Sequence, residues 1–359
     1  MRWPILVLAG YAGTVFWALS LALVDGAGGL TRALLAEDSY LTDVADVGDD
    51  PLGYLATFTD HGAEHSAATR GHPPGPVLLL WAAQRAGLTN HLALGVLVTA
   101  LGAAAVPLVL SAVRGTCGEL PARRFVPVLV LAPYAVWLAV SVDAVGMLLG
   151  AAMVAAGVRA SAPARTGWSA AASGVACGAL LGVAALLSYA APWLGLSVVC
   201  LYFARRRPFL NLATGLGALL PVLGAQLAGF GWTDGLLAAQ ADYATRIGPY
   251  RSLWWWAGIS LVALLLAAGP ALVASLRKVR NTPGWPFLVG AGVAVLFSLV
   301  AGLARGGIEH AWLPFFPWLT VAAVAPQRPG GPPPASPLLL VTVGALTAIV
   351  VEAVLATPW

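Results

Sequence analysis

The residues best suited to chemistry are concentrated in one stretch of the chain, residues 25–75. This stretch holds nine of the fifteen acidic residues and three of the five histidines, although only 9% of the chain is charged. A carboxylate with an ordinary pKa of about 4 is ionised at neutral pH and can take a proton from a hydroxyl group. The pattern therefore predicts acid–base chemistry or metal binding in this stretch.

The acidic part of the stretch opens with Glu37-Asp38-Ser39-Tyr40 and closes with Asp49-Asp50. If this part is helical, Asp43, Asp46 and Asp50 lie along one stripe, where like charges repel one another. Such a stripe is either a solvated acidic face or a set of groups held for catalysis or metal binding. Asp38 is the first candidate for a general base, followed by Glu37, Asp49 and Asp50, with Tyr40 as a substrate contact.

Three further residues, His61, Glu64 and His65, have the H-x-x-E-H spacing of one class of zinc protease. Such an enzyme also needs a third protein ligand and a soluble catalytic domain, and this loop offers neither. We therefore expect an ordinary polar loop here. A divalent cation, Mg²⁺ or Mn²⁺, is an alternative, but its ligands cannot be assigned from the sequence.

The stretch ends in His72-Pro73-Pro74-Gly75. Two consecutive prolines favour an extended backbone and have no N–H group to satisfy. This suits a chain that folds back from an exposed loop into the apolar segment 76–88, which we interpret as an interfacial helix. His72 then either lines a substrate site or is an incidental residue of a helix-entry turn.

Candidate substrate contacts also occur in the later loops. Arg246, Arg251 and Arg305 lie beside apolar segments, and an arginine fork can bind a phosphate group. The alternative is that these side chains reach lipid headgroups. Glu309 and His310 directly precede an apolar segment, where an ionisable pair is costly unless it is satisfied or used. We expect all five residues to contact substrate.

These residues are set between apolar segments that must position them. Apolar residues make up 59% of the chain, and uncharged runs of about 20 residues recur from end to end, which is typical of a polytopic membrane protein. We expect an all-α bundle of about eleven transmembrane helices in a single integral membrane domain, residues 1–359. The expected spans are 4–24, 91–113, 125–141, 144–160, 168–188, 190–204, 209–230, 254–275, 284–303, 311–325 and 337–357.

The distribution of charge predicts the orientation. With the N-terminus in the cytoplasm, most arginines fall on the cytoplasmic side, as the positive-inside rule requires, whereas most acidic residues and all histidines fall outside. The first extracytoplasmic loop is then residues 25–90, and a Pro-rich cytoplasmic loop spans residues 326–336. The chemistry is expected on the outer face of the plasma membrane.

Several classes of function are excluded by composition and motifs. The net charge is +4, but the basic residues are scattered among loops rather than gathered in a patch, so nucleic-acid binding is not expected. The chain has no Walker or dinucleotide motif, and the cytoplasmic loops are too short to hold one. A donor that carries a nucleotide is therefore not expected.

Three of these segments resemble the GT-C superfamily of glycosyltransferases, which includes the protein O-mannosyltransferases and aminoarabinose transferases, and in particular its small actinobacterial members. Glu37-Asp38-x-Tyr40 resembles the catalytic acidic motif that follows the first span of the family, although the order of the two acids is reversed. His72-Pro73-Pro74 resembles the element H/K-P-P-L, with Gly75 in place of Leu. The segment 309–314, Glu-His-Ala-Trp-Leu-Pro, resembles an E-R-x-W-L-P segment, with His310 in place of Arg.

The resemblance covers residues 1 to about 325 and implies a polyprenyl-phosphate sugar donor and an extracytoplasmic glycan, lipid or protein acceptor. It implies a carboxylate base in the first outer loop. Two other functions stay open. One is a transporter or flippase of lipid-linked sugars, which should have charged or Gly/Pro-broken helices near the bilayer midplane. The other is a non-catalytic membrane scaffold. Membrane lipids are expected partners in each case.

Overall fold

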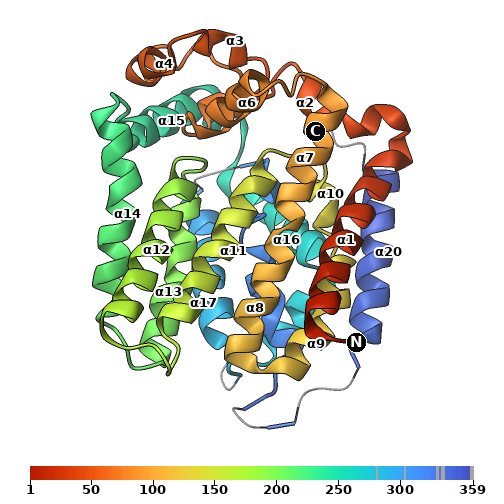
Figure 1. The fold of residues 1–359 in the computed structure, drawn as a ribbon. Coiled ribbons are helices and arrows are strands. Elements are labelled where there is room, and N and C mark those ends of the chain that lie inside the picture. The colour runs from red at the N-terminus through yellow and green to blue at the C-terminus, as the bar shows by residue number, and fades with distance from the viewer. Residues whose placement is uncertain (280–281, 303–304, 329–330, 333–335, 356–359) are drawn as a thin grey trace.

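The computed structural model is an all-helical bundle with a layer of short helices across one end (Figure 1). It describes residues 1–279, 282–302, 305–328, 331–332 and 336–355. The predicted all-α membrane class is confirmed within these ranges. Part of the predicted Pro-rich loop, residues 329–330 and 333–335, lies outside them.

Six helical stretches in the described residues are long and apolar enough to cross a membrane. They comprise α1 (Trp3–Ala22) with η1 (Leu23–Asp25), α7 (His91–Ala103) with α8 (Ala105–Cys117), α11 (Asp143–Ala160), α12 (Gly167–Ala185), α14 (Leu210–Leu227) and α16 (Leu253–Leu276). Three shorter apolar helices accompany them: α13 (Ala191–Ala204), α17 (Trp285–Ala301) and α20 (Leu338–Val354). All nine lie within or across predicted spans.

The predicted number of eleven spans is not confirmed, because two of the predicted spans are divided into short helices. Segment 125–141 is split between α9 (Glu119–Val130) and α10 (Ala135–Leu138), with Pro133 between them. Segment 311–325 contains the end of α18 (Ile308–Ala311), then α19 (Phe316–Thr320) and η4 (Val321–Ala323).

Burial inside the bundle explains the apolar character of the second of these segments. Phe316 and Trp318 have no exposed surface, so their apolar side chains meet other helices rather than lipid. Pro314 lies in the break before α19, because proline lacks the N–H that a continuous helix needs. Pro317 lies in the first turn of α19, where this N–H is not needed. The hydrophobic run is therefore a buried core segment. Composition alone does not distinguish such a segment from a membrane span.

The first loop folds into a layer of short helices, which we call the loop layer. Its helices are η2 (Ala27–Leu30), α2 (Arg32–Leu35), α3 (Val44–Val47), α4 (Pro51–Thr57), α5 (Ala67–Arg70) and α6 (Gly75–Arg85). Figure 1 shows α3, α4 and α6 over one end of the bundle, together with α15 (Trp232–Arg246). Leu34, Val47, Phe58 and Leu80 of the layer form a hydrophobic cluster with residues of the bundle, which include Leu94 of α7.

Two sequence expectations for this layer need revision. The stripe of Asp43, Asp46 and Asp50 on one helix is wrong, because only Val44–Val47 is helical in that region and Gly48 then reverses the chain with a φ of 54°. The helix α15 was expected to be loop. By contrast, α6 closely matches the helix predicted over residues 76–88.

Candidate active site

The structure brings together three polar side chains that are far apart in sequence. Oδ1 of Asp143 accepts a hydrogen bond of 2.9 Å from the hydroxyl of Tyr40, and Oδ2 lies 3.3 Å from Nδ1 of His310. Tyr40 is buried, and the side chains of His310 and Asp143 are only 18% and 17% exposed. These three residues, which we call the Asp143 cluster, connect the loop layer, α11 and α18.

A strained turn before α11 fixes the position of Asp143. Val140 has a φ of 57°, which is unfavourable for a β-branched residue, and its N–H donates to Oγ1 of Thr99 at 2.8 Å. Gly102 packs so closely that a Cβ atom there would lie 2.5 Å from Cβ of Ala144. Asp143 is the first residue of α11, where the helix dipole favours a negative charge.

A second turn positions His72 beside the Asp143 cluster. The rings of His72 and Tyr40 meet edge to face, with centroids 5.4 Å apart, and Nδ1 of His72 lies 2.9 Å from the carbonyl oxygen of Ala68. The N–H of Gly75 donates to the carbonyl of Leu186 at 3.1 Å, and a Cβ at this position would lie 2.2 Å from that oxygen. The close approach explains why glycine follows the two prolines.

Two members of the Asp143 cluster, Asp143 and His310, line a small cavity. Its walls include His72 from the loop layer, Asp143 from α11, Ser188 from the loop after α12, and His310 from α18. A hydroxyl, a carboxylate and two imidazoles thus face one space, which is a typical arrangement for a site that binds and activates a polar substrate.

The environment shifts the ionisation of two members of the cluster. Burial raises the pKa of Tyr40 well above its ordinary value, and the negative charge of Asp143 adds to this shift, so Tyr40 acts as a hydrogen-bond donor. Burial alone would lower the pKa of His310, but the hydrogen bond to Asp143 and the charges of Asp143 and Glu309 raise it overall. The half-buried Glu309 thus favours the imidazolium form of His310.

The two acids predicted as the general base, Glu37 and Asp38, lie three and two positions before Tyr40 in the chain, and neither lines the cavity beside Asp143. Glu37 and Asp38 are exposed on the turn that leads into Tyr40, and the carbonyl of Asp38 accepts a hydrogen bond of 3.1 Å from the N–H of Ala68. Within the described part of the chain, neither carboxylate forms an ion pair or a side-chain hydrogen bond. Both are therefore accessible to a substrate that approaches from the loop layer.

The second predicted acidic pair makes structural contacts instead. Asp49 is paired with Arg85 of α6 and is 92% exposed. Oδ1 of Asp50 accepts a hydrogen bond of 2.9 Å from the N–H of Gly53, which makes Asp50 the N-cap of α4. Neither residue lines the cavity beside Asp143.

The three predicted phosphate-binding arginines fall into two groups. Arg246 is paired with Asp242 at 2.6 Å. Arg251 and Arg305 each donate to the other's backbone carbonyl, and Arg251 also lies over the ring of Trp256 at 4.3 Å. In the second group, two positively charged guanidinium groups lie close together and donate hydrogen bonds to neutral carbonyl groups.

A second cavity of about 500 Å³ lies between the loop layer and α15, and its walls include Arg70, Tyr189 and Asp242. Arg70 is 3.5 Å from Asp242, and this ion pair links α5 to α15. The cavity is thus lined by both the first loop and a helix that the sequence did not predict.

The sequence analysis missed Asp143. Asp143 directly follows a predicted span, 125–141, and precedes the next, which begins at residue 144. An acidic residue between two apolar segments is a signal that could have identified it. Its partner Tyr40 could not be identified this way, because the contact depends on how the first loop folds over the bundle.

Comparison with solved structures supports the assignment of the fold. The chain is similar to the crystal structure of ArnT from Cupriavidus metallidurans in the apo state, with 18% identity, a TM-score of 0.50, and coverage of 77% of this chain and 54% of that chain. It is also similar to the same protein bound to undecaprenyl phosphate, with 17% identity, a TM-score of 0.54, and coverage of 89% and 59%.

These similarities confirm the predicted GT-C fold. The chain spans less than two thirds of the length of either ArnT structure. No protein-family profile matches the chain, and no curated protein sequence matches it.

Proposed function

We propose that this protein is a membrane glycosyltransferase that moves a sugar from a polyprenyl-phosphate donor to an acceptor in the cell envelope. The observation that carries the proposal is the Asp143 cluster, a largely buried carboxylate in contact with Tyr40 and His310 beside a cavity at the end of a GT-C bundle. The structure of ArnT bound to undecaprenyl phosphate, which has the same fold, supports a lipid-linked donor.

The proposed reaction needs a base for the acceptor and a counter-charge for the leaving group. A carboxylate of the first loop, Asp38 with Glu37 next, takes the proton of the acceptor hydroxyl. The acceptor oxygen then bonds to the anomeric carbon, and the bond from this carbon to the phosphate oxygen breaks. The electron pair of that bond leaves with the polyprenyl phosphate. Asp143 holds His310 at the cavity wall and accepts the hydrogen bond of Tyr40.

Cationic side chains stabilise the departing phosphate. The raised pKa of His310 favours its protonated form, and this residue stands where the resembling family motif has arginine. Arg251 and Arg305 form the other candidate group, because their guanidinium groups contact neutral carbonyls rather than carboxylates. His72, which also lines the cavity, and Tyr40, whose ring meets that of His72, are proposed to contact the sugar.

One observation favours the alternative of a flippase for lipid-linked sugars. Helix α16 is broken at Gly269, where φ is 62° and ψ is −161°, immediately before Pro270. A Gly/Pro break inside a span is the feature expected of a transporter. The cavity of about 270 Å³ at this break includes Tyr134 and Leu340 but no charged side chain, so it lacks a partner for a sugar phosphate.

The two functions are distinguished by reconstituting the full chain in proteoliposomes with a radiolabelled polyprenyl-phosphate sugar and an envelope extract as acceptor. A glycosyltransferase releases polyprenyl phosphate and labels the acceptor, and Asp143→Asn reduces both. A flippase instead moves intact donor between leaflets without release. Donor movement with no cleavage would overturn the proposed enzyme.

A further inference from the structure

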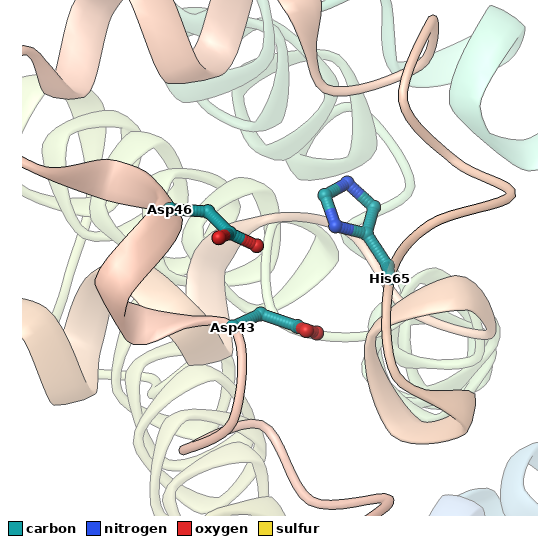
Figure 2. Close-up of side chains that lie close together, drawn as sticks. All are labelled: Asp43, Asp46 and His65. Carbon is teal, nitrogen blue, oxygen red and sulfur yellow. The ribbon is translucent and has the colours of Figure 1, made fainter.

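Outside the Asp143 cluster, the loop layer contains a second group of chemically active side chains. Asp43, Asp46 and His65 each offer a ligand atom, and these atoms all lie within 4.8 Å of one another. Figure 2 shows both carboxylates and one ring nitrogen of His65 turned toward a common space. Asp43 and His65 are buried, with 4% exposure each, and Asp46 is exposed.

The hydrogen bonding of His65 leaves one nitrogen directed at the acids. Its Nε2 lies 3.3 Å from the carbonyl oxygen of Phe58, which can only accept, so the proton is on Nε2. Nδ1 has no hydrogen-bond partner in the described residues and carries a lone pair in the neutral ring. A lone pair that faces two carboxylates is unfavourable, and either a cation between these groups or a proton on Nδ1 removes the repulsion.

The charges of the two acids have no cationic partner nearby. No ion pair in the described part of the chain involves Asp43 or Asp46. Arg32, the closest arginine along the chain, pairs with Asp25. Arg70 donates to the carbonyl oxygen of His65 at 2.6 Å and pairs with Asp242 at 3.5 Å. The carboxylate of Asp43 is oriented by Ser66, whose N–H and hydroxyl donate to it at 3.1 Å and 2.7 Å.

A tyrosine adds a further unsatisfied polar atom. The hydroxyl of Tyr54 is buried and has no partner in the described residues. Burial raises the pKa of Tyr54, and the negative charges of Asp43 and Asp46 raise it further, so this hydroxyl lies within the field of both acids. The ring of Tyr54 is 6.0 Å from that of His65, and Phe58 stacks on His65 at 4.8 Å.

We propose that Asp43, Asp46 and His65 bind a divalent cation of the zinc type. One imidazole and two carboxylates suit Zn²⁺ better than Mg²⁺ or Ca²⁺, which prefer oxygen ligands alone. Water completes the coordination. The bond from Nε2 of His65 to a carbonyl and the bonds from Ser66 to Asp43 are the outer contacts that orient ligands in zinc sites.

The ligands come from two segments that also carry residues of the candidate active site. Tyr40 precedes Asp43 on one segment, and His72 follows His65 on the other. A bound cation would therefore fix the positions of Tyr40 and His72 relative to each other. The site differs from the H-x-x-E-H motif, because His61 is exposed and its Nδ1 lies 3.1 Å from the carbonyl of Thr57.

Metal content tests this proposal without any substrate, so its outcome is independent of the proposed glycosyltransferase activity. The full chain, purified in detergent without a histidine tag, is treated with EDTA, incubated with Zn²⁺, desalted and measured by mass spectrometry of metals. We expect about one Zn²⁺ per chain and at least ~10-fold weaker binding in Asp46→Asn and His65→Gln. Asp46 is exposed, so its substitution should not disturb folding.

The matched controls are His61→Gln and Glu64→Gln, which should keep the bound Zn²⁺. Retention of Zn²⁺ in both Asp46→Asn and His65→Gln would overturn the site. The site would also be overturned if the parent chain bound no Zn²⁺ and an NMR titration showed that His65 is an imidazolium ion held by Asp46. Zinc should also slow proteolysis of the loop layer in the parent but not in Asp46→Asn.

Discussion

The hydroxyl of Tyr40 donates a 2.9 Å hydrogen bond to Asp143, a residue 103 positions away in the chain. This bond attaches the loop layer to the first turn of α11. The contact therefore links the position of the first loop to the position of Asp143 in the candidate site.

The substitution Tyr40→Phe should destabilise the protein and impair catalysis together. It removes a hydrogen bond to a buried carboxylate, a loss of about 1.5–3 kcal/mol. Thermal unfolding in detergent and sugar transfer from a polyprenyl-phosphate donor measure the two effects. Tyr250→Phe is the matched control, because Tyr250 is 85% exposed, and it should behave as the parent does. Parental stability in Tyr40→Phe would contradict the contact.

The general base is tested by Asp38→Asn and Glu37→Gln. Loss of a general base typically lowers the rate about 10²–10⁴-fold, and both side chains are exposed, so stability should change little. Transfer rates of membranes with matched expression provide the measurement, with the exposed Asp49→Asn as control. If both variants retain parental rates while Asp143→Asn collapses, the base is Asp143.

His310 should give a pH dependence with a definite sign. Its pKa is raised in the folded protein, so it contributes stability that is fully present below its unfolded pKa of about 6.5. This contribution is lost as pH rises through the folded pKa. Unfolding measured across this range should show parental stability declining with pH, and His310→Gln should lose that component. An identical pH profile for both proteins would contradict the assignment.

Arg251 and Arg305 should not tolerate lysine if they hold the donor phosphate. Each guanidinium reaches a backbone carbonyl of the other residue's segment, and a lysine ammonium cannot keep this fork geometry. We expect Arg251→Lys or Arg305→Lys to raise the KM for the donor with a smaller effect on kcat. Arg246→Lys provides the comparison, since Arg246 is already neutralised by Asp242. Parental KM values in all three variants would place the phosphate elsewhere.

The orientation in the membrane can be measured by cysteine labelling. Ala63 lies in the loop layer and Ala164 in the loop between α11 and α12, and both are exposed. In intact cells with a permeable outer envelope, an impermeant maleimide should label Ala63→Cys and should not label Ala164→Cys. Labelling of the parent chain, which has three native cysteines, gives the background signal to subtract. The reverse pattern would place the Asp143 cluster on the cytoplasmic side.

The sequence by itself determined the all-α membrane class of the protein and pointed to the segments that form the candidate site. Hydrophobic runs are a local property, so nine apolar helical stretches of the described residues and the helix α6 could be predicted from composition and length. The motifs around Glu37-Asp38-x-Tyr40, His72 and His310 pointed to segments that the structure brings to one end of the bundle. Here Tyr40, His72 and His310 meet around Asp143.

Only the tertiary structure decided which of the ionisable residues act together. Asp50 looked like a catalytic acid but caps α4, and Asp49 pairs with Arg85, whereas Asp143 was overlooked and lies at the centre of the site. The segment around Trp318 resembled a span but is a buried core. The physical reason is the same in each case: burial and hydrogen-bond partners arise from contacts between distant segments, and local sequence does not encode them separately.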